Sequence, residues 1–370
     1  MSRIDQVRTR RVTTDLHTPF VTSLRRTTTT DTVVVQVVDT DGNVGWGEAP
    51  QVWQVTGESL AGAEACIVGP LSGAVTGRHV DDLAENCRAV AAAVAANHGA
   101  KAAVDVALHD LAAHRRGVSL PVFLGGTSLR VPTDVTLTVG EAADLADAAR
   151  SRVTEGFTVL KLKVGTDAAT DVERVRAVRA AVDGTGPVGP VGPVCTDIRI
   201  RLDANQGWTA REAVQVISAL EDAQLDIELV EQPLPAADLD GMAWVTARVS
   251  TPVMADESVY GVRDLVEVIR RRSADLVNVK LAKCGGLSVA RTLLEVARAH
   301  GVGTMVGSMM ETHIGVGAAA SLVAAHPTSA ISDLDAAWWA ASSPVIGGLT
   351  YSGAAVALPD APGLGVEGFA

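Results

Sequence analysis

Aromatic residues are scarce in this sequence: Phe, Trp and Tyr together make up 3% of its 370 residues. Basic residues are also outnumbered, because 31 Lys and Arg stand against 43 Asp and Glu and give a net charge of −12. Nucleic-acid-binding proteins need a basic face, and binding of single strands uses aromatic rings on which bases stack. The two shortages therefore argue against a nucleic-acid partner and fit an enzyme.

Cysteines and long apolar runs are also in short supply. The four cysteines lie far apart and none has Cys-x-x-Cys spacing, which predicts reduced thiols. No apolar run reaches the roughly 18 residues of a membrane span. The N-terminus, MSRIDQVRTRRV, is charged and no apolar stretch follows it, so no signal peptide is predicted. We therefore expect a cytoplasmic protein with no membrane partner.

The chain is long enough for one large barrel and a smaller domain, and 47% of it is hydrophobic. Its first part predicts a small antiparallel sheet followed by helices. Val33–Val38 is a β-branched run, and the pair Asp41-Gly42 after it is a hairpin signal. An alanine-rich stretch from Asp81 to Arg116 has apolar residues at helical spacing. This part is typical of an α+β domain.

From about Pro132 strand and helix patterns alternate. This order predicts an α/β fold with a parallel sheet, and about eight strands are the number in a closed barrel. A low-complexity insert, Gly184–Pro193, is predicted to be a surface loop. The predicted strands are Val135–Val139, Thr158–Val164, Ile198–Ala204, Glu228–Val230, Val253–Ala255, Leu276–Leu281, Gly303–Gly307 and Ala330–Leu334, and the predicted helices include Glu141–Glu155, Asp171–Val182, Ala210–Asp222, Val262–Arg272 and Ser288–His300.

Polar residues end these strands at nearly regular intervals. From Asp203 to Glu231, Asp256 and Lys280 the steps are 28, 25 and 24 residues, about the length of a strand, a helix and two loops. Since a β/α barrel keeps its active site at the carboxyl ends of its strands, these residues are candidates for it. The full set of strand ends is Lys161 and Lys163, Asp203, Glu231, Asp256, Asn278 and Lys280, Ser308 and Met310, and Asp333 and Asp335.

Lys161 and Lys163 share one strand face because side chains alternate along a strand. Their mutual repulsion is expected to lower the pKa of at least one, which would make it a general base near neutral pH. Lys280, on the same strand face as Asn278, is a second candidate. The alternative is an ordinary solvated lysine at a strand end.

Asp203, Glu231 and Asp256 end three consecutive strands. Adjacent strands lie about 4.8 Å apart, so the three carboxylates should converge and repel one another. A hard dication such as Mg²⁺ resolves that repulsion with oxygen ligands. Salt bridges to the lysines are the alternative.

A metal with a lysine on either side suggests abstraction of a proton α to a carboxylate, with an enediolate as the intermediate. If the proton leaves on one side and returns on the other, the reaction is a racemisation or an epimerisation. If one lysine acts alone, elimination or cycloisomerisation remains possible.

These strand ends resemble those of the enolase superfamily, in its muconate-lactonizing subgroup, over almost the whole chain. The resemblance implies a modified (β/α)7β barrel over residues 129–351 and an α+β capping domain over residues 1–128, with 352–370 packing back on it. It also implies Mg²⁺ on Asp203, Glu231 and Asp256, with Lys163 and Lys280 as the acid/base pair. The matching motifs are Gly45-Trp-Gly-Glu-Ala49, Lys161-x-Lys163, Asp203-Ala-Asn-Gln-Gly-Trp208, Glu231-Gln-Pro233, Ala255-Asp-Glu-Ser258 and Asn278-Val-Lys280.

Within the subgroup, Asp333-Leu-Asp335 resembles the acidic pair by which dipeptide epimerases bind the α-ammonium group of the substrate. An exposed acidic turn or a contact that closes the barrel is the alternative. The resemblance therefore implies a dipeptide substrate such as L-Ala-D/L-Glu, and a homo-oligomer.

The resemblance also implies further substrate contacts. An arginine in the loop around His17–Thr30 is expected to hold a glutamate side chain, and Arg25 resembles that residue, with Arg26 as the alternative. Thr136 and Lys161 are expected to contact the substrate from the first barrel strands. Ser308 and Met310 share a face and are candidates to line the pocket, although Met310 fits core packing nearly as well.

Three other activities use the same barrel: N-acylamino acid racemase, o-succinylbenzoate synthase and muconate cycloisomerase. An acidic pair that faces the substrate would not help with substrates that lack an ammonium group. A barrel that has lost catalysis and acts as a binding protein is a remote alternative, because all three acids and both lysines are present.

Overall fold

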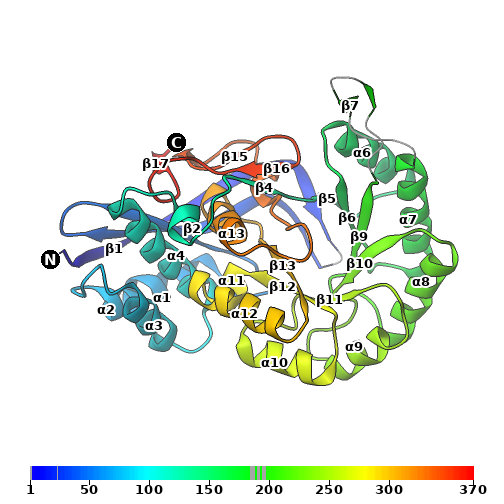
Figure 1. Ribbon diagram of the computed structural model, residues 1–370, viewed down its shortest axis with the longest axis horizontal. Helices are drawn as coiled ribbons and strands as arrows, with labels where there is room; N and C mark the ends of the chain where they lie inside the picture. Colours follow the sequence, from blue (N-terminus) through cyan, green and yellow to red (C-terminus); the bar gives the residue numbers. More distant parts are fainter. Residues whose placement is uncertain (1, 23, 184–187, 190–191, 194–196) are drawn as a thin grey trace.

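The computed structural model describes residues 2–22, 24–183, 188–189, 192–193 and 197–370, which form a small N-terminal sheet with helices and a larger barrel beside it (Figure 1). Most of the low-complexity insert, Gly184–Pro193, lies outside the described residues. Within it, Val188–Gly189 (β7) pairs antiparallel with Gly192–Pro193 (β8). Among the described residues, no helix combines the length and apolar character needed to cross a membrane.

The N-terminal sheet is antiparallel, in the order β1 (Ile4–Val21), β2 (Arg26–Asp39) and β3 (Val44–Pro50). The predicted hairpin at Asp41-Gly42 joins β2 to β3. The buried Asp39 carboxylate accepts hydrogen bonds from the backbone N–H groups of Asp41 at 3.0 Å and Asn43 at 2.8 Å. Gly42 takes a φ of +87°, which glycine adopts without strain. The hairpin prediction is therefore confirmed.

Helix α4 packs along β3 over nearly its whole buried length. Gly45 and Gly47 of β3 make this possible, because a Cβ on either residue would lie 2.1 Å from Ala107 O or 2.0 Å from Ala103 O. The motif Gly45-Trp-Gly therefore brings a strand onto a helix backbone. The helices of this part are α1 (Leu60–Cys66), α2 (Ser72–Val75), α3 (Leu83–Ala93), α4 (His98–Arg115) and α5 (Leu120–Phe123), with a π-helical turn, η1 (Ile67–Leu71), between α1 and α2.

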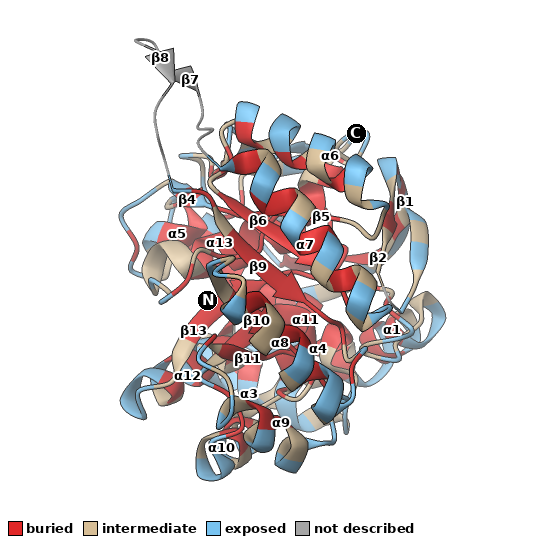
Figure 2. Cartoon of the chain, turned by 90° about the vertical axis from the view of Figure 1, so that its right-hand side faces the viewer, coloured by how far each residue is buried: buried red, intermediate tan, exposed pale blue. Residues whose placement is uncertain are grey.

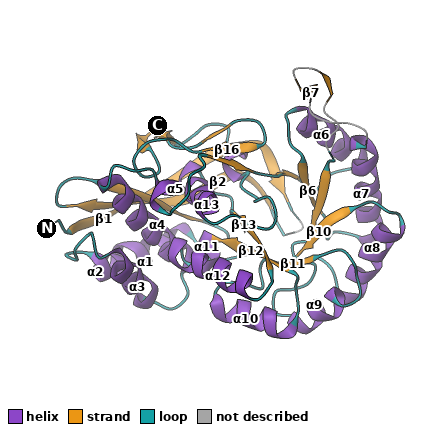
Figure 3. Ribbon diagram, viewed as in Figure 1, coloured by secondary structure: helices purple, strands orange, loops and turns teal. Residues whose placement is uncertain are grey.

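Seven parallel strands form the barrel wall, in the order β13-β12-β11-β10-β9-β6-β5. Helices cover the outside of this wall (Figure 3), and the exposed faces of those helices point away from the buried strands (Figure 2). The strands are β5 (Val135–Leu137), β6 (Val159–Lys163), β9 (Arg199–Asp203), β10 (Ile227–Glu231), β11 (Val253–Ala255), β12 (Leu276–Lys280) and β13 (Gly303–Gly307). The helices are α6 (Ala142–Thr154), α7 (Ala168–Val182), α8 (Ala210–Asp222), α9 (Leu239–Thr246), α10 (Val262–Arg271), the short α11 (Leu281–Cys284), α12 (Leu287–Ala299) and α13 (His313–Ala325).

An eighth segment closes the barrel between β13 and the start of β5. Ser332 forms a parallel bridge with Thr133, and Asp333 forms one with Gly307. Asp333 donates its backbone N–H to Val306 O, and Ser308 donates to Asp333 O, both at 3.0 Å. Seven strand–helix units and a final strand segment make this a (β/α)7β barrel, as the sequence predicts. The predicted last strand, Ala330–Leu334, is reduced to these bridges.

The C-terminal segment returns to the N-terminal part. Leu364 donates its backbone N–H to Asp110 of α4 at 2.5 Å, and Trp46 of β3 contacts Phe369 with ring centroids 5.2 Å apart. These contacts are consistent with the predicted division at residues 128/129 and 351/352, which stays a proposal. The chain after the closing segment contains η2 (Ala336–Trp339), β14 (Val345–Gly347) and β15 (Thr350–Tyr351), and the C-terminal segment itself contains β16 (Ala355–Ala357) and β17 (Val366–Phe369). Strand β14 pairs with β17, and β16 pairs with β15 and with β4 (Arg130–Pro132).

Candidate active site

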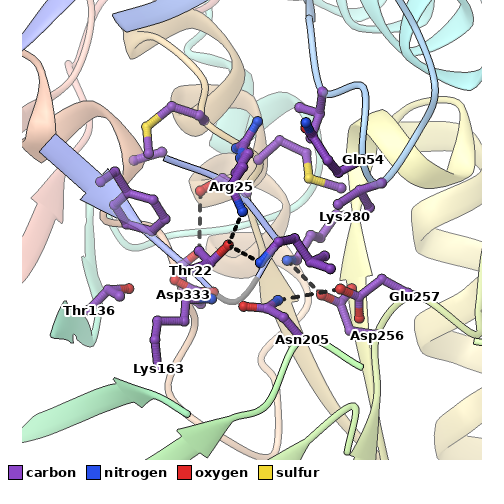
Figure 4. Close-up of a pocket in the computed structure, with 18 of the residues that line it drawn as sticks. Thr22, Arg25, Gln54, Thr136, Lys163, Asn205, Asp256, Glu257, Lys280 and Asp333 are labelled. Carbon is purple, nitrogen blue, oxygen red and sulfur yellow. Dashed lines mark hydrogen bonds and ion pairs between the residues drawn. The ribbon is translucent and has the colours of Figure 1, made fainter. Parts of the chain in front are cut away.

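The predicted acid/base lysines face one pocket at the carboxyl ends of the barrel strands (Figure 4). Lys163 ends β6 and Lys280 ends β12. Three strands, β9, β10 and β11, separate β6 from β12, so the two strands are four steps apart in a barrel of eight. The lysines therefore approach the pocket from opposite sides of the barrel.

The three predicted metal ligands lie on the strands between these lysines. Asp203, Glu231 and Asp256 follow one another across the sheet and are no more than 1% exposed. The ammonium of Lys161 lies between two of them, 2.9 Å from Asp203 Oδ2 and 2.7 Å from Glu231 Oε2. Asp256 lines the pocket, as do Lys163 and Lys280, whereas Lys161, Asp203 and Glu231 are buried and are not part of its lining. The salt bridges weighed as the alternative to a metal are thus present.

Asp256 is held by two lysines. Lys280 Nζ lies 2.8 Å from Asp256 Oδ2, and Lys283 of the short helix α11 pairs with the other carboxylate oxygen and donates to the backbone carbonyl of Asp256. Asn278 donates to Glu231 Oε1 at 2.8 Å, which fixes the neighbouring carboxylate. Lys283 is buried and has no predicted role, and its place one helical turn after Lys280 is the signal that could have identified it.

The pKa of Lys161 is raised, so Lys161 is not the lysine of the Lys161/Lys163 pair whose pKa the repulsion was expected to lower, and the pKa of Lys280 is raised as well. Burial acts to lower the pKa of Lys161, but Asp203, Asp333 and Glu231 outweigh it and raise the pKa well above the ordinary value. Burial likewise acts to lower the pKa of Lys280, and Asp256 and Glu231 raise it overall. The repulsion between lysines is weaker than their attraction to the acids, because each ammonium is in direct contact with a carboxylate.

The site nevertheless holds more negative charge than its lysines compensate. Burial, with Asp203 and Asp256 nearby, raises the pKa of Glu231 to about 7. Burial and Asp256 raise the pKa of Glu257 to about 8, and its Oε2 is buried with no hydrogen-bond partner among the described residues. Despite burial, Lys161 and Lys163 hold the pKa of Asp203 below its ordinary value, and Lys280 and Lys283 do the same for Asp256, so both stay charged beside Glu231. A dication can bind all three carboxylates through oxygen, the ligand that Mg²⁺ prefers. Asp203, Glu231 and Asp256 therefore fit a magnesium site.

The predicted ammonium-binding acids both reach the pocket. Asp333 lies in the closing segment and pairs with Lys161 at 2.7 Å. Asp335 Oδ2 accepts hydrogen bonds from Thr136 N at 2.8 Å and from Trp339 Nε1 at 3.0 Å. Asp333 thus closes the barrel and also lines the pocket. The two interpretations of this motif, a contact that closes the barrel and an acid that faces the substrate, therefore both apply to Asp333.

Arg25 lines the pocket from the β1–β2 turn, whereas Arg26 is exposed and lies outside it. Thr22 and Arg25 exchange hydrogen bonds across this turn, at 2.9 and 3.2 Å. Burial lowers the pKa of Arg25, and among the described residues no carboxylate pairs with its guanidinium. The structure thus presents a half-buried cation to the pocket and favours Arg25 over Arg26.

The remaining predicted contacts also lie at the pocket: Thr136, Ser308 and Met310 line it. Ser308 donates its hydroxyl to Asp333 O at 3.3 Å. Several other lining residues could not be predicted from the sequence. The turn after β3, for example, has no apolar periodicity that would indicate that it contacts the barrel. The lining residues that sequence reasoning did not assign are Phe20, Thr22, Leu24, Val52, Gln54, Val55, Asn205, Glu257, Met309 and Ala336.

A (β/α)7β barrel with clustered acids and opposed lysines at its strand ends, beside an α+β domain that supplies part of the pocket wall, defines the enolase class of enzyme. Residues 144–368 match the family described as "Enolase C-terminal domain-like", and residues 4–125 match "Mandelate racemase / muconate lactonizing enzyme, N-terminal domain". The chain belongs to this mandelate racemase/muconate lactonizing enzyme family of the enolase superfamily.

Its similar proteins include epimerases. The chain is 40% identical to the L-Ala-D/L-Glu epimerase of Bacillus subtilis, over 100% of this chain and 98% of that protein. A substrate-liganded structure of that enzyme has a TM-score of 0.93, with 100% of this chain and 99% of the other covered. A structure of the dipeptide epimerase of Enterococcus faecalis, complexed with Mg and the dipeptide L-Leu-L-Tyr, is 36% identical, has a TM-score of 0.91 and covers 99% of each chain.

Proposed function

We propose that the protein is a Mg²⁺-dependent dipeptide epimerase that inverts the C-terminal residue of a dipeptide such as L-Ala-D/L-Glu. The observation that carries the proposal is the position of Lys163 and Lys280 on opposite sides of one pocket. Inversion at a carbon needs one group to remove a proton from one face and another to return a proton to the other face. An acid/base pair on a single side would support elimination instead.

The similar proteins support this reaction. The Bacillus subtilis relative is named an L-Ala-D/L-Glu epimerase, and the Enterococcus faecalis structure holds Mg and a dipeptide. Identity extends over essentially the whole chain, so both the pocket and the domain that covers it have counterparts in those proteins.

Asp203, Glu231 and Asp256 would hold the magnesium ion. When bound, Mg²⁺ would bind the substrate carboxylate and offset the negative charge that develops there as the α-proton leaves. If Asp256 and Glu231 bound the ion, their negative charge would attract the Lys280 ammonium less strongly, and the pKa of Lys280 would be raised less. That change favours the neutral amine which a general base requires.

The proton then moves between the lysines and the α-carbon of the C-terminal residue. One lysine takes the α-proton with its neutral amine and becomes an ammonium, and the opposite lysine, which starts as an ammonium, donates its own proton to the other face of the α-carbon. The two roles exchange when the other epimer is the substrate. Lys163 and Lys280 line the pocket, and the buried Lys161, paired with Asp203 and Glu231, would contact the substrate carboxylate.

Recognition of the two ends of the dipeptide rests on charge. Asp333 and Asp335 would bind the α-ammonium group, and Arg25 would bind the side-chain carboxylate of a C-terminal glutamate. Guanidinium and carboxylate form a charge-assisted pair with two parallel hydrogen bonds. Because no carboxylate among the described residues pairs with Arg25, we expect Ala-Glu to be preferred over a wholly apolar dipeptide.

Proton NMR in D₂O tests the reaction directly. With Mg²⁺ present, L-Ala-L-Glu should exchange its glutamate α-proton for deuterium and form L-Ala-D-Glu, and EDTA should stop both. A panel of dipeptides that shows no α-exchange with Mg²⁺ would overturn the proposal.

Asp335→Asn separates this function from N-acylamino acid racemisation on the same barrel. The substitution removes a negative charge expected to bind an ammonium group, so kcat/KM for the dipeptide should fall by roughly 10- to 100-fold. An N-acylated amino acid has no ammonium group there, so its turnover should be unaffected. Equal losses on both substrates would count against a dipeptide substrate.

A further inference from the structure

A second cluster of metal-binding side chains lies outside the pocket, between α3 and α4. Cys87 comes from α3, and Asp105 and His109 stand one turn apart on α4. One ligand atom from each lies within 4.8 Å of the other two, and all three residues are buried. His109 Nδ1 is 4.0 Å from Cys87 Sγ and 3.4 Å from Asp105 Oδ1.

Ser288 orients the carboxylate of Asp105, but no lysine or arginine among the described residues neutralises its charge. Ser288, at the start of α12, donates its hydroxyl to Asp105 Oδ2 at 2.7 Å and its backbone N–H to Oδ1 at 3.3 Å. Among the described residues, neither Lys nor Arg forms an ion pair with Asp105, which is 2% exposed. His109 can pair with Asp105 only when its ring is protonated, so a cation bound beside the thiol and the imidazole would supply the positive charge that this buried carboxylate otherwise lacks.

We propose that Cys87, Asp105 and His109 form a binding site for a zinc-class divalent ion, distinct from the magnesium site. In a tetrahedral zinc site the metal lies about 2.3 Å from sulfur and 2.0–2.2 Å from nitrogen or oxygen, so the ligand atoms are roughly 3.3–3.6 Å apart. The His109–Asp105 distance of 3.4 Å already fits, the Cys87–His109 distance of 4.0 Å must shorten by a few tenths of an ångström, and the Cys87–Asp105 pair lies within 4.8 Å, so the side chains must close slightly around the ion. Thiolate and carboxylate together balance the charge of a dication, and sulfur and nitrogen ligands select against Mg²⁺.

Binding releases one proton and changes one hydrogen bond. The thiol of Cys87 is deprotonated as its sulfur binds the ion, and the proton passes to water. His109 Nδ1, 2.8 Å from Asp105 O, must present its lone pair to the ion with the ring proton on Nε2. It then gives up a hydrogen bond to that carbonyl.

A cavity of about 450 Å³ gives the ion a route in and leaves room for a water as fourth ligand. Cys87, His109 and Ser288 line it, together with residues of α3, α10 and α12. Asp105 already joins α4 to α12 through Ser288, so an ion on Asp105 would clamp two helices of the N-terminal part where they meet the barrel. The expected effect is on stability, since none of these residues lines the pocket around Lys163 and Lys280.

Cobalt is a suitable probe, because Co²⁺ bound to a thiolate has a charge-transfer absorption in the near ultraviolet and Co²⁺ bound by oxygen ligands alone does not. The full-length protein is first saturated with Mg²⁺ and then given one equivalent of Co²⁺. The wild type should develop the absorption and a higher Tm. Cys66→Ala, which removes another buried cysteine of the same part of the chain, should behave as the wild type does, and Cys87→Ala should show neither change.

Two outcomes overturn the proposal: no charge-transfer absorption in the wild type, or the same absorption in Cys87→Ala. Should Cys87→Ala fail to fold, crystals of the wild type grown with Mg²⁺ and Zn²⁺ decide the matter. An anomalous peak at the zinc edge between Cys87, Asp105 and His109 supports the site. Its absence, with zinc present elsewhere, overturns it.

Discussion

At the scale of single residues, the opposed lysines allow the two faces of the reaction to be separated. Lys163→Met and Lys280→Met should each lower the rate of epimerisation by roughly 10²–10⁴-fold, the usual contribution of a positioned acid or base. Each variant should still exchange the α-proton of one epimer, the one that faces the lysine left in place. NMR in D₂O with the two epimers tested separately measures this.

Each variant serves as the control for the other. The epimer whose α-proton Lys163→Met exchanges should be the epimer that Lys280→Met leaves unexchanged. If both variants exchanged both epimers equally, a base other than these lysines would be acting.

Arg25 provides a second test at this scale. Arg25→Leu should reduce kcat/KM for L-Ala-L-Glu by roughly 10- to 100-fold, the range for one lost hydrogen-bonded charge pair. A dipeptide with an apolar C-terminal residue should be turned over as well as before or better. Arg26→Leu is the matched control, since Arg26 is exposed and outside the pocket. A larger loss in Arg26→Leu would reassign the contact.

The strand-end residues could be predicted from the sequence because alternation fixes the side-chain direction in a strand. Asp203, Glu231 and Asp256 lie where that rule places them. The rule says nothing of distance, so it could not show that Lys161 stands between two of these acids. For the same reason it could not show that the pKa of Lys161 is raised.

At the scale of elements, a strand of one part caps a helix of the other. Glu48 of β3 accepts hydrogen bonds through Oε1 from Thr312 N and Oγ1, both at 2.9 Å, and from Gly315 N at 2.5 Å, at the start of α13. Gly315 leaves the space for this carboxylate, because a Cβ there would lie 2.7 Å from Glu48 Oε1.

Substitution of Glu48 should therefore destabilise the protein according to whether an acceptor remains. Glu48→Ala leaves buried donors without a partner and should lower the free energy of unfolding by about 1–3 kcal/mol relative to Glu48→Gln, which keeps an oxygen. Denaturant unfolding of both variants measures the difference. Coincident unfolding curves would mean that water replaces the carboxylate.

Most barrel elements could be predicted because each buries a continuous apolar strand or an apolar helix face. Val253–Ala255, Gly303–Gly307 and Ala210–Asp222 have the predicted bounds. The long strand β1 (Ile4–Val21) could not be predicted in this way, because few of its residues are buried and its sequence lacks an alternation of apolar and polar residues. It is held by hairpin pairing with β2, whose backbone hydrogen bonds leave no apolar pattern in the sequence.

At the scale of the whole molecule, Asp110 connects three distant segments. It lies on α4 and accepts hydrogen bonds from Trp46 N at 2.7 Å and Leu364 N at 2.5 Å. Burial outweighs these bonds and raises its pKa from 3.8 to about 7. The C-terminal segment is thus held to the N-terminal part by a buried acid.

This pKa predicts the pH dependence of stability. Below about pH 4 the acid is protonated in both states, and its contribution is complete. Between pH 4 and 7 the unfolded state ionises and the folded state does not, so the contribution is lost as the pH rises. The unfolding free energy of the wild type minus that of Asp110→Asn should therefore fall over this range in urea titrations. A difference that grows with pH would mean that the backbone donors keep Asp110 ionised when folded.

The barrel is continuous in hydrogen bonding from β5 to β13 and is joined by the bridges at Ser332 and Asp333 where it closes. The residues proposed to transfer the proton and hold the metal belong to the continuous wall, and the acids proposed to recognise the substrate belong to the closure. The residues proposed to bind the ammonium group and those proposed to move the proton therefore lie on separate pieces of backbone. A lineage can replace the closing segment, and with it the ammonium or acyl group that it accepts, while the strands that carry Lys163 and Lys280 keep their register.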